Sequence, residues 1–140
     1  MRNAILFPAL FFLLCGASAH AKPAVDQPQL PATYMPSGKQ MFKQYCAACH
    51  GVDGKGRGPV MYSLKTPAPD LTTLAKRHEG KFPYDYVTSV LRFGPGFASH
   101  GSADMPTWGA LFQYLDKYNQ AAVLKRIKNL CDYLASLQEK

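Results

Sequence analysis

The motif Cys46-Ala47-Ala48-Cys49-His50 is the most informative feature of this 140-residue chain. Cysteines three positions apart at the end of a helix lie on nearly the same face. Two thiols placed in this way reach the two vinyl groups of one porphyrin edge and add across them as thioethers. The adjacent His50 can then turn its imidazole under the ring and bind the iron. This C-x-x-C-H spacing is the attachment signature of a c-type haem.

Three other uses of the same cysteines stay open as alternatives. A thioredoxin-like C-x-x-C motif belongs to a βαβ unit, and the sequence indicates no such unit. A structural zinc site needs four ligands in compact pairs, but no second C-x-x-C and no H-x-x-x-H accompanies the motif. A disulfide across two intervening residues is strained. Haem attachment is the interpretation that the spacing favours.

The segment before the motif predicts export. Residues 1–21 combine Arg2, an almost wholly apolar run over residues 4–14 and the small residues Ala19-His20-Ala21, which is typical of a cleaved secretory signal. An uncleaved anchor is the alternative, although the run is short for a membrane span. Residues 22–36 are rich in proline and predict a flexible leader. We therefore expect a periplasmic domain over residues 37–140, with no membrane span after cleavage.

Helical signals lie on both sides of the motif. Residues 37–48 predict a helix, because Pro36 and Ser37 are start signals and apolar residues follow at helical spacing, namely Met41, Phe42 and Tyr45. Residues 51–59 contain four glycines and predict a loop. The motif is therefore expected at the end of the first helix.

Further along the chain, short helices alternate with loops. Asp70 is expected to cap a short helix through Ala75, and Pro83 to open a second helix that ends at Gly94. Residues 93–106 predict a long loop. After Asn119 an apolar stripe of helical period predicts the last helix, with Val123, Ile127, Leu130, Leu134 and Leu137 on it. No segment predicts a strand, so the fold class is a small all-α domain.

These segments together resemble the class I c-type cytochromes of the bacterial monohaem type, from about Gly38 to Leu137. Besides the haem motif, four features carry the resemblance. They are Gly38, Phe42 and Cys46 at intervals of four, the glycine-rich loop 51–59, the segment Met105-Pro106-Thr107-Trp108-Gly109, and the amphipathic last helix with Tyr133. The resemblance implies short helices and long loops around one covalently attached haem c. It also implies that the first and last helices cross steeply, with Gly38 in the gap and Phe42 against Leu130, Tyr133 or Leu134.

The resemblance also implies a set of site residues. Cys46, Cys49 and His50 would bind the haem, with His50 as the first axial ligand and Met105 as the second. The carbonyl of Pro59 would accept the Nδ1–H of His50, which orients the ring. Because a thioether favours Fe(II), His/Met ligation raises the reduction potential.

Alternatives to parts of this set stay open. His78 and His100 are rival second ligands, and bis-histidine ligation would lower the potential. Candidates for the haem propionates are basic or hydroxyl side chains, namely Lys55, Arg57, Tyr62 and Arg92. An apolar slot is expected from Leu71, Leu74, Val87, Val90, Leu91, Trp108 and Leu111. Cys131 lies on the apolar side of the last helix and is expected to be buried, with pairing to a partner as the alternative.

Composition bears on the function class. The formal net charge is +7, with 16 basic and 9 acidic residues, so a basic surface would steer the protein to redox partners with acidic docking faces. Nucleic-acid binding is disfavoured, because the positive charges are interspersed with acids. The leading hypothesis is a periplasmic electron carrier that is not an enzyme. The alternatives are a cytochrome subunit of a larger oxidoreductase and a haem enzyme or gas sensor with an open distal site.

Overall fold

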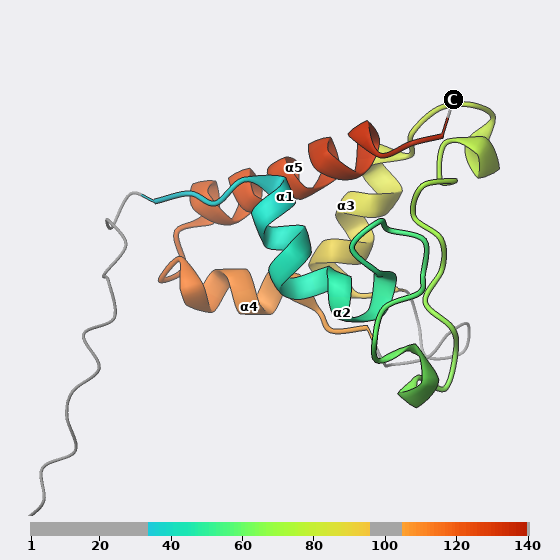
Figure 1. Cartoon of the computed structure of the whole chain (residues 1–140). Helices are drawn as coiled ribbons and strands as arrows, with labels where there is room; N and C mark the ends of the chain where they lie inside the picture. Colours follow the sequence, from blue (N-terminus) through green and yellow to red (C-terminus); the bar gives the residue numbers. More distant parts are fainter. Residues whose placement is uncertain (1–33, 96–104, 140) are drawn as a thin grey trace, which may run out of the picture. The chain divides into compact units, whose positions relative to one another are not determined.

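The computed structural model describes residues 34–95 and 105–139, all of which belong to the unit Ala32–Lys140 (Figure 1). The predicted signal, most of the leader and His100 lie outside the described residues. The elements are α1 Gly38–Met41, η1 Phe42–Cys46, α2 Ala47–His50, η2 Met61–Ser63, η3 Lys76–His78, α3 Tyr84–Phe93, α4 Trp108–Leu115 and α5 Gln120–Ser136. The described ranges contain no strand, which confirms the all-α prediction.

The predicted first helix is confirmed and runs on to His50. Ser37 caps it with a reciprocal pair of bonds, because its Oγ accepts from the Gln40 amide at 3.2 Å and its own amide donates to the Gln40 side chain at 2.9 Å. The middle part, η1, is a π-helical turn, a feature that is frequent at functional sites. It ends at Cys46, so the two cysteines and His50 occupy the last turns of this helical stretch.

The first and last helices meet at Gly38. A Cβ at this position would overlap the carbonyl of Asn129 and would lie 2.7 Å from the Cβ of Tyr133. Only glycine allows the two backbones to come this close. Beside it, the rings of Phe42 and Tyr133 are 5.4 Å apart between centroids. The expected contact between the terminal helices is therefore confirmed, and α1 crosses α5 near the middle of its length (Figure 1).

The segment between the haem motif and α3 differs from expectation. The Asp70 carboxylate accepts from the amide of Thr72 at 2.8 Å and from its hydroxyl at 2.6 Å. It therefore caps a turn, and the helix expected through Ala75 is wrong. A single 3₁₀ turn, η3, follows and ends where Glu79 takes a left-handed conformation with φ of 55°. The helix from Pro83 to Gly94 is confirmed as α3.

Helix α4 is an element that the sequence did not predict. It begins at Trp108, within the segment Met105-Pro106-Thr107-Trp108-Gly109, and it packs on both α3 and α5. Gly109 allows the contact with α3, because a Cβ there would overlap the Arg92 carbonyl. The far end of α4 is held by a two-bonded ion pair, in which Asp116 accepts from Nε and Nη2 of Arg126 at 2.8 Å each.

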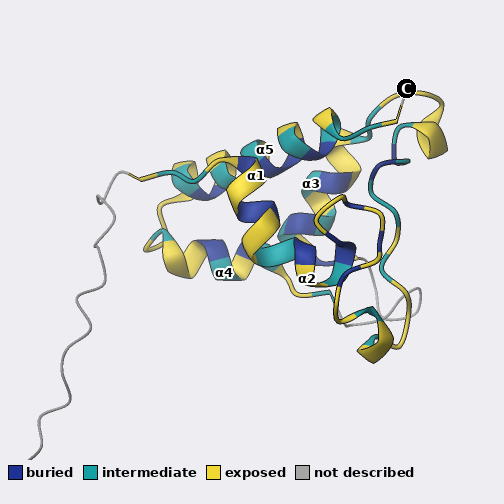
Figure 2. Ribbon diagram, in the orientation of Figure 1, coloured by how far each residue is buried: buried dark blue, intermediate teal, exposed yellow. Residues whose placement is uncertain are grey.

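The core lies between the terminal helices and the pair α3–α4. Figure 2 shows the buried side of each helix turned inward. Asn119 caps α5 as predicted, by accepting from the Ala122 amide. Cys131 is fully buried, as expected of a small apolar residue, and its Sγ lies 3.5 Å from the Thr88 hydroxyl. The core residues are Met41, Phe42, Ala47, Leu74, Val87, Leu91, Phe112, Val123, Ile127, Leu130, Cys131 and Leu134.

Candidate cofactor site

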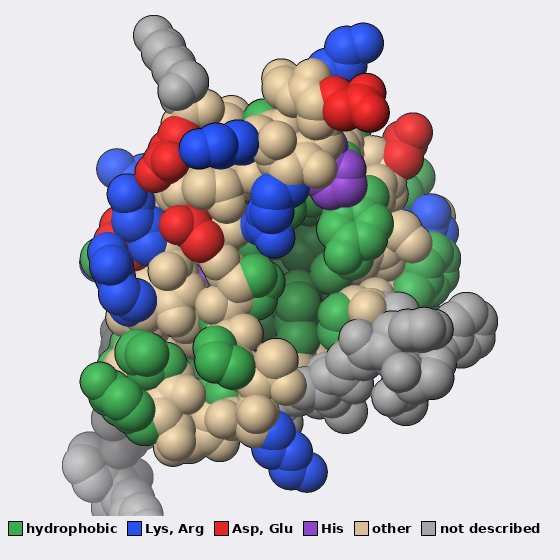
Figure 3. Space-filling model, turned by 90° about the vertical axis from the view of Figure 1, so that its right-hand side faces the viewer, with side chains coloured by type: hydrophobic (Ala, Val, Ile, Leu, Met, Phe, Trp, Pro, Cys, Tyr) green, Lys and Arg blue, Asp and Glu red, His purple; other side chains and the backbone are tan. Residues whose placement is uncertain are grey.

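A cavity of about 470 Å³ opens where the haem motif, the 64–78 segment, α3 and the Met105 segment come together. Its size is within the range of cofactor sites. Figure 3 looks into this hollow, which is surrounded by hydrophobic side chains. Six of the seven residues expected to form an apolar slot line it, and the seventh, Leu111, does not. Those that do are Leu71, Leu74, Val87, Val90, Leu91 and Trp108.

Cys46 and Cys49 both line the cavity as free, partly buried thiols. Burial, and secondly the proximity of Cys49, raises the pKa of Cys46 to about 12. Cys46 is therefore a neutral thiol at physiological pH. The motif thus presents two unpaired sulfur atoms to one apolar space.

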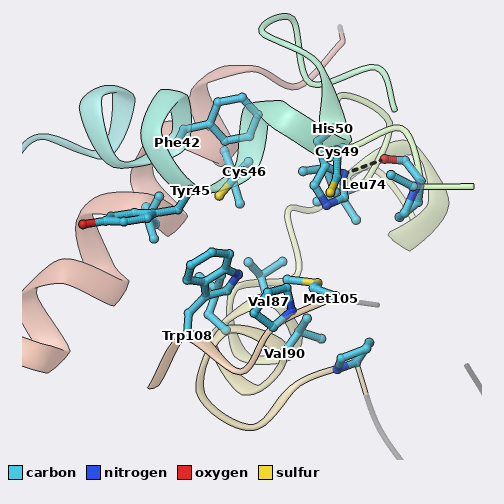
Figure 4. A pocket seen from close by; sticks show the side chains of 18 of the residues that line it. Phe42, Tyr45, Cys46, Cys49, His50, Leu74, Val87, Val90, Met105 and Trp108 are labelled. Atoms are coloured by element: carbon cyan, nitrogen blue, oxygen red, sulfur yellow. Dashed lines mark hydrogen bonds between the residues drawn. The ribbon is translucent and has the colours of Figure 1, made fainter. Parts of the chain in front are cut away.

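His50 is held in a single orientation. Its ring is 7% exposed, and Nδ1 lies 3.1 Å from the carbonyl oxygen of Pro69, a contact drawn as the dashed line in Figure 4. Since a carbonyl only accepts, Nδ1 carries the proton and Nε2 keeps a free lone pair. Burial lowers the pKa of His50, and the bond to Pro69 opposes this shift. The ring is neutral and presents one basic nitrogen, which is the form that binds a metal.

Pro59 is not the partner of His50, which corrects the expectation taken from the resemblance. Pro59 is exposed, and its neighbours bond back to the helix end, with Gly58 N donating to Cys49 O and Val60 N to Ala48 O. The loop therefore runs along the backbone of α2 rather than over the imidazole. Pro69 takes the role instead. The proline pair in Thr66-Pro67-Ala68-Pro69 is the sequence signal for a stiff segment with carbonyls unused by a helix.

Met105 faces the same cavity from the side opposite the motif. Figure 4 shows the Met105 side chain and the Trp108 ring across the cavity from Cys46, Cys49 and His50. Trp108 packs against Tyr45 in a tilted arrangement, with 5.4 Å between ring centroids. Among the methionines of the described residues, only Met105 lines the cavity, whereas Met41 is buried in the core. The structure thus places four of the five expected site residues around one space.

The expected propionate partners all lie away from the cavity. Lys55 pairs with Glu139 at 3.1 Å and Arg57 with Asp53 at 3.6 Å. The guanidinium of Arg92 lies over the Phe93 ring at 4.8 Å, and Tyr62 is 92% exposed. None of the four lines the cavity.

Arg77 is the site residue that sequence reasoning missed. It is the one Arg or Lys of the described residues that lines the cavity, and its guanidinium donates to the carbonyls of Asp70 and Thr73. His78 lines the cavity next to it and packs on Tyr86, with 5.7 Å between ring centroids. These side chains reach the cavity because residues 70–78 form turns where a helix through Ala75 was expected.

Two further findings concern metal ligands and membrane-spanning helices. Over residues 34–95 and 105–139, no group of three or more His, Cys, Asp or Glu side chains is arranged to hold a metal ion. Across the same ranges, no helix is both long enough and apolar enough to cross a membrane.

Comparison with known proteins gives a family for this arrangement. The model of the cytochrome c family, described as cytochrome c, matches residues 36–138. The match covers the helical domain from its first cap to the last residues after α5. Neither the comparison with curated proteins nor that with solved structures found a match.

Proposed function

The chain belongs to the cytochrome c family, and we propose that it is an exported electron carrier whose haem is held by Cys46, Cys49, His50 and Met105. Membership makes it a monohaem class I cytochrome with covalently bound haem c, and it implies redox partners. The observation that carries the residue assignment is the convergence of all four side chains on one apolar cavity. When bound, the haem supplies an iron that cycles between Fe(II) and Fe(III).

Three residues would hold one side of the haem. Cys46 and Cys49 form the thioethers, which suits their state as free thiols that point into an apolar space. Nε2 of His50 would bind the iron. The Pro69 carbonyl fixes the ring and, by accepting the Nδ1 proton, makes Nε2 a stronger donor.

Met105 would bind the iron from the other side of the haem. Its sulfur is a soft neutral ligand that raises the reduction potential. The surrounding apolar wall keeps water from the iron. His78 also lines the cavity, but it sits at the exposed mouth against Tyr86 rather than on the segment that faces His50.

Arg77 would hold a carboxylate of the haem. Its guanidinium is anchored by two backbone carbonyls and still borders the cavity. An anchored arginine binds a carboxylate with less loss of side-chain freedom than a solvated lysine. A fixed positive charge near the iron also stabilises Fe(II) relative to Fe(III).

The cellular role rests on the sequence. Residues 1–21 have the pattern of a secretory signal, and c-type haem is commonly attached outside the bacterial cytoplasm. Removal of the signal with its Arg2 lowers the formal net charge from +7 to +6, and this positive charge favours donors and acceptors with acidic faces. With both axial positions taken by the chain, no coordination site is left for a substrate, so we propose a carrier rather than an enzyme.

A second function has one observation in its favour. Large apolar side chains are exposed where α4 turns into α5, with Tyr114 73%, Tyr118 76%, Leu115 43% and Leu124 46% accessible. Such a group suits a permanent partner. The alternative is therefore a cytochrome subunit of a larger oxidoreductase.

One preparation tests both functions. The full chain is expressed with haem-attachment machinery and purified from the exported fraction, and its intact mass and native mass are measured. A carrier gives a monomer with one haem bound covalently and the signal removed. Isolation in a stable complex with another redox protein would favour the subunit. A chain without covalent haem would overturn the assignment of the cysteines.

A further inference from the structure

The side chain of Gln138, just beyond α5, makes three hydrogen bonds. Its Nε2 donates to the carbonyls of Leu71 and Leu134, at 2.8 and 2.7 Å. Its Oε1 accepts from the amide of Ala75 at 2.8 Å. Two of the three partners belong to the turn over residues 71–75, so this one amide spans that turn and joins it to the end of the last helix.

Glu139 adds a second connection to the same turn. Its backbone amide donates to the Thr72 carbonyl at 2.8 Å, and its carboxylate meets the Lys55 ammonium at 3.1 Å. Thr72 is itself buried. Gln138 and Glu139 thus replace the backbone partners that a helix at 71–75 would have supplied to itself.

The turn held in this way forms part of the cofactor site. Leu71 and Leu74 belong to the cavity wall. The same segment begins two residues after Pro69, whose carbonyl accepts the Nδ1 proton of His50. At its near end, the Leu71 amide donates to the Gly54 carbonyl at 2.7 Å, and the Leu71 carbonyl accepts from Gln138. At its far end, the Ala75 amide donates to Gln138.

We propose that Gln138 is a positioning residue for the axial histidine. By fixing residues 71–75, it holds the Pro69 carbonyl at hydrogen-bond distance from Nδ1 of His50 and thereby sets how strongly Nε2 donates to the iron. The inference rests on the proposed function, in which His50 is the ligand. A weaker Nδ1 bond lowers ligand basicity, and a poorer donor stabilises Fe(III) less, so loss of Gln138 raises the reduction potential.

Two variants test this against a matched control. Gln138→Ala removes all three bonds, whereas Gln138→Glu keeps the length of the side chain and the acceptor for Ala75 but loses both amide donors. Ser136→Ala is the control, because it removes a bond of 2.6 Å to the Tyr133 carbonyl at the same end of α5 without touching the turn. The readouts on the haem-loaded proteins are the reduction potential and the hydrogen exchange of the His50 Nδ1 proton by NMR.

The expected result is a higher potential in Gln138→Ala, at least tenfold faster exchange of the Nδ1 proton in both Gln138 variants, and wild-type values for Ser136→Ala. Gln138→Glu is compared by exchange alone, because its added negative charge favours Fe(III) by itself. An unchanged potential in Gln138→Ala would overturn the proposal. A lower potential in Gln138→Ala would also overturn it, because it would show that water entering past Leu71 and Leu74 outweighs the His50 bond.

Failure of the proposed function can be distinguished from failure of the Gln138 proposal. It would appear in the wild-type protein itself, as absence of covalent haem or of an axial histidine signal.

Discussion

His50 donates its Nδ1 proton to the carbonyl of Pro69, nineteen residues further along the chain, at 3.1 Å. One segment therefore orients the proposed axial ligand and also supplies Leu71 and Leu74 to the apolar wall of the cavity. A change in the backbone of residues 69–75 therefore alters two properties together. These are the basicity of His50 and the access of water to the cavity.

Gly38→Ala is predicted to destabilise the protein by about 3 kcal/mol or more, because the new methyl overlaps the Asn129 carbonyl at the α1–α5 contact. Guanidinium unfolding measures this effect. Gly80→Ala is the control. A Cβ there meets nothing within 4 Å, so only the left-handed backbone is penalised, at about 1 kcal/mol. Equal losses in the two variants would show that the helices do not depend on the close approach.

Asp116→Ala is predicted to cost about 3 kcal/mol of unfolding free energy. Its side chain and that of Arg126 are only 8% and 11% exposed, so the substitution leaves a buried guanidinium without its partner. Lys128→Ala breaks an exposed pair with Asp132 on the same helix and is expected to cost under about 1 kcal/mol. Similar small losses in both would contradict the structural role given to the buried pair.

The Tyr84 hydroxyl is predicted to make stability fall at alkaline pH. Its hydrogen bond to Asp132, followed by burial, raises the pKa of Tyr84 to about 12. The unfolded value is about 10. The folded state therefore holds its proton more tightly, and this stabilisation is complete below pH 10 and lost between pH 10 and 12.

Unfolding titrations of wild type and Tyr84→Phe across this pH range test the point. The variant is expected to be less stable below pH 10 and to show a smaller decline up to pH 12. Asp132→Ala, which removes the acceptor, is expected to behave in the same way. If stability falls as much in both variants as in wild type, the loss of stability at alkaline pH comes from a group other than Tyr84.

Arg77→Gln is predicted to lower the reduction potential, because a positive charge beside the haem favours Fe(II). Lys76→Gln removes the same charge from the neighbouring position, which does not line the cavity, and is expected to shift the potential less. Potentiometric titration at low ionic strength compares the two. If the reduction potential of the Lys76 variant changes as much as that of the Arg77 variant, the effect comes from overall surface charge. Arg77 would then not contact the haem.

Local signals predicted the helices that carry their own start and stop residues. Ser37, Pro83, Gly94 and Asn119 marked real boundaries, and Gly38 marked the close contact. Helix α4 was not predicted: Thr107 precedes it and is a residue type that can cap a helix, but its side chain makes no cap bond in the structure. Its helical state depends on packing against α3 and α5.

The site was predictable to a similar degree. The motif and Met105 are short, dense patterns, and the structure places them around one cavity. Pro59 and Arg77 show the limit of this approach. Which carbonyl reaches His50, and which cation reaches the cavity, depends on how the 59–78 segment turns. That turn is set by side chains far away in sequence, such as Gln138 on Ala75 and Leu71.

The central claim, a closed site with His50 and Met105 as axial ligands, is tested most directly by carbon monoxide titration of the ferrous protein. Wild type and His78→Ala are expected to give sharp low-spin spectra that do not respond to the gas. Met105→Ala is expected to bind it and to lose the charge-transfer band of thioether-ligated Fe(III). Gas binding by the wild-type protein, or by His78→Ala with no change in Met105→Ala, would contradict the account.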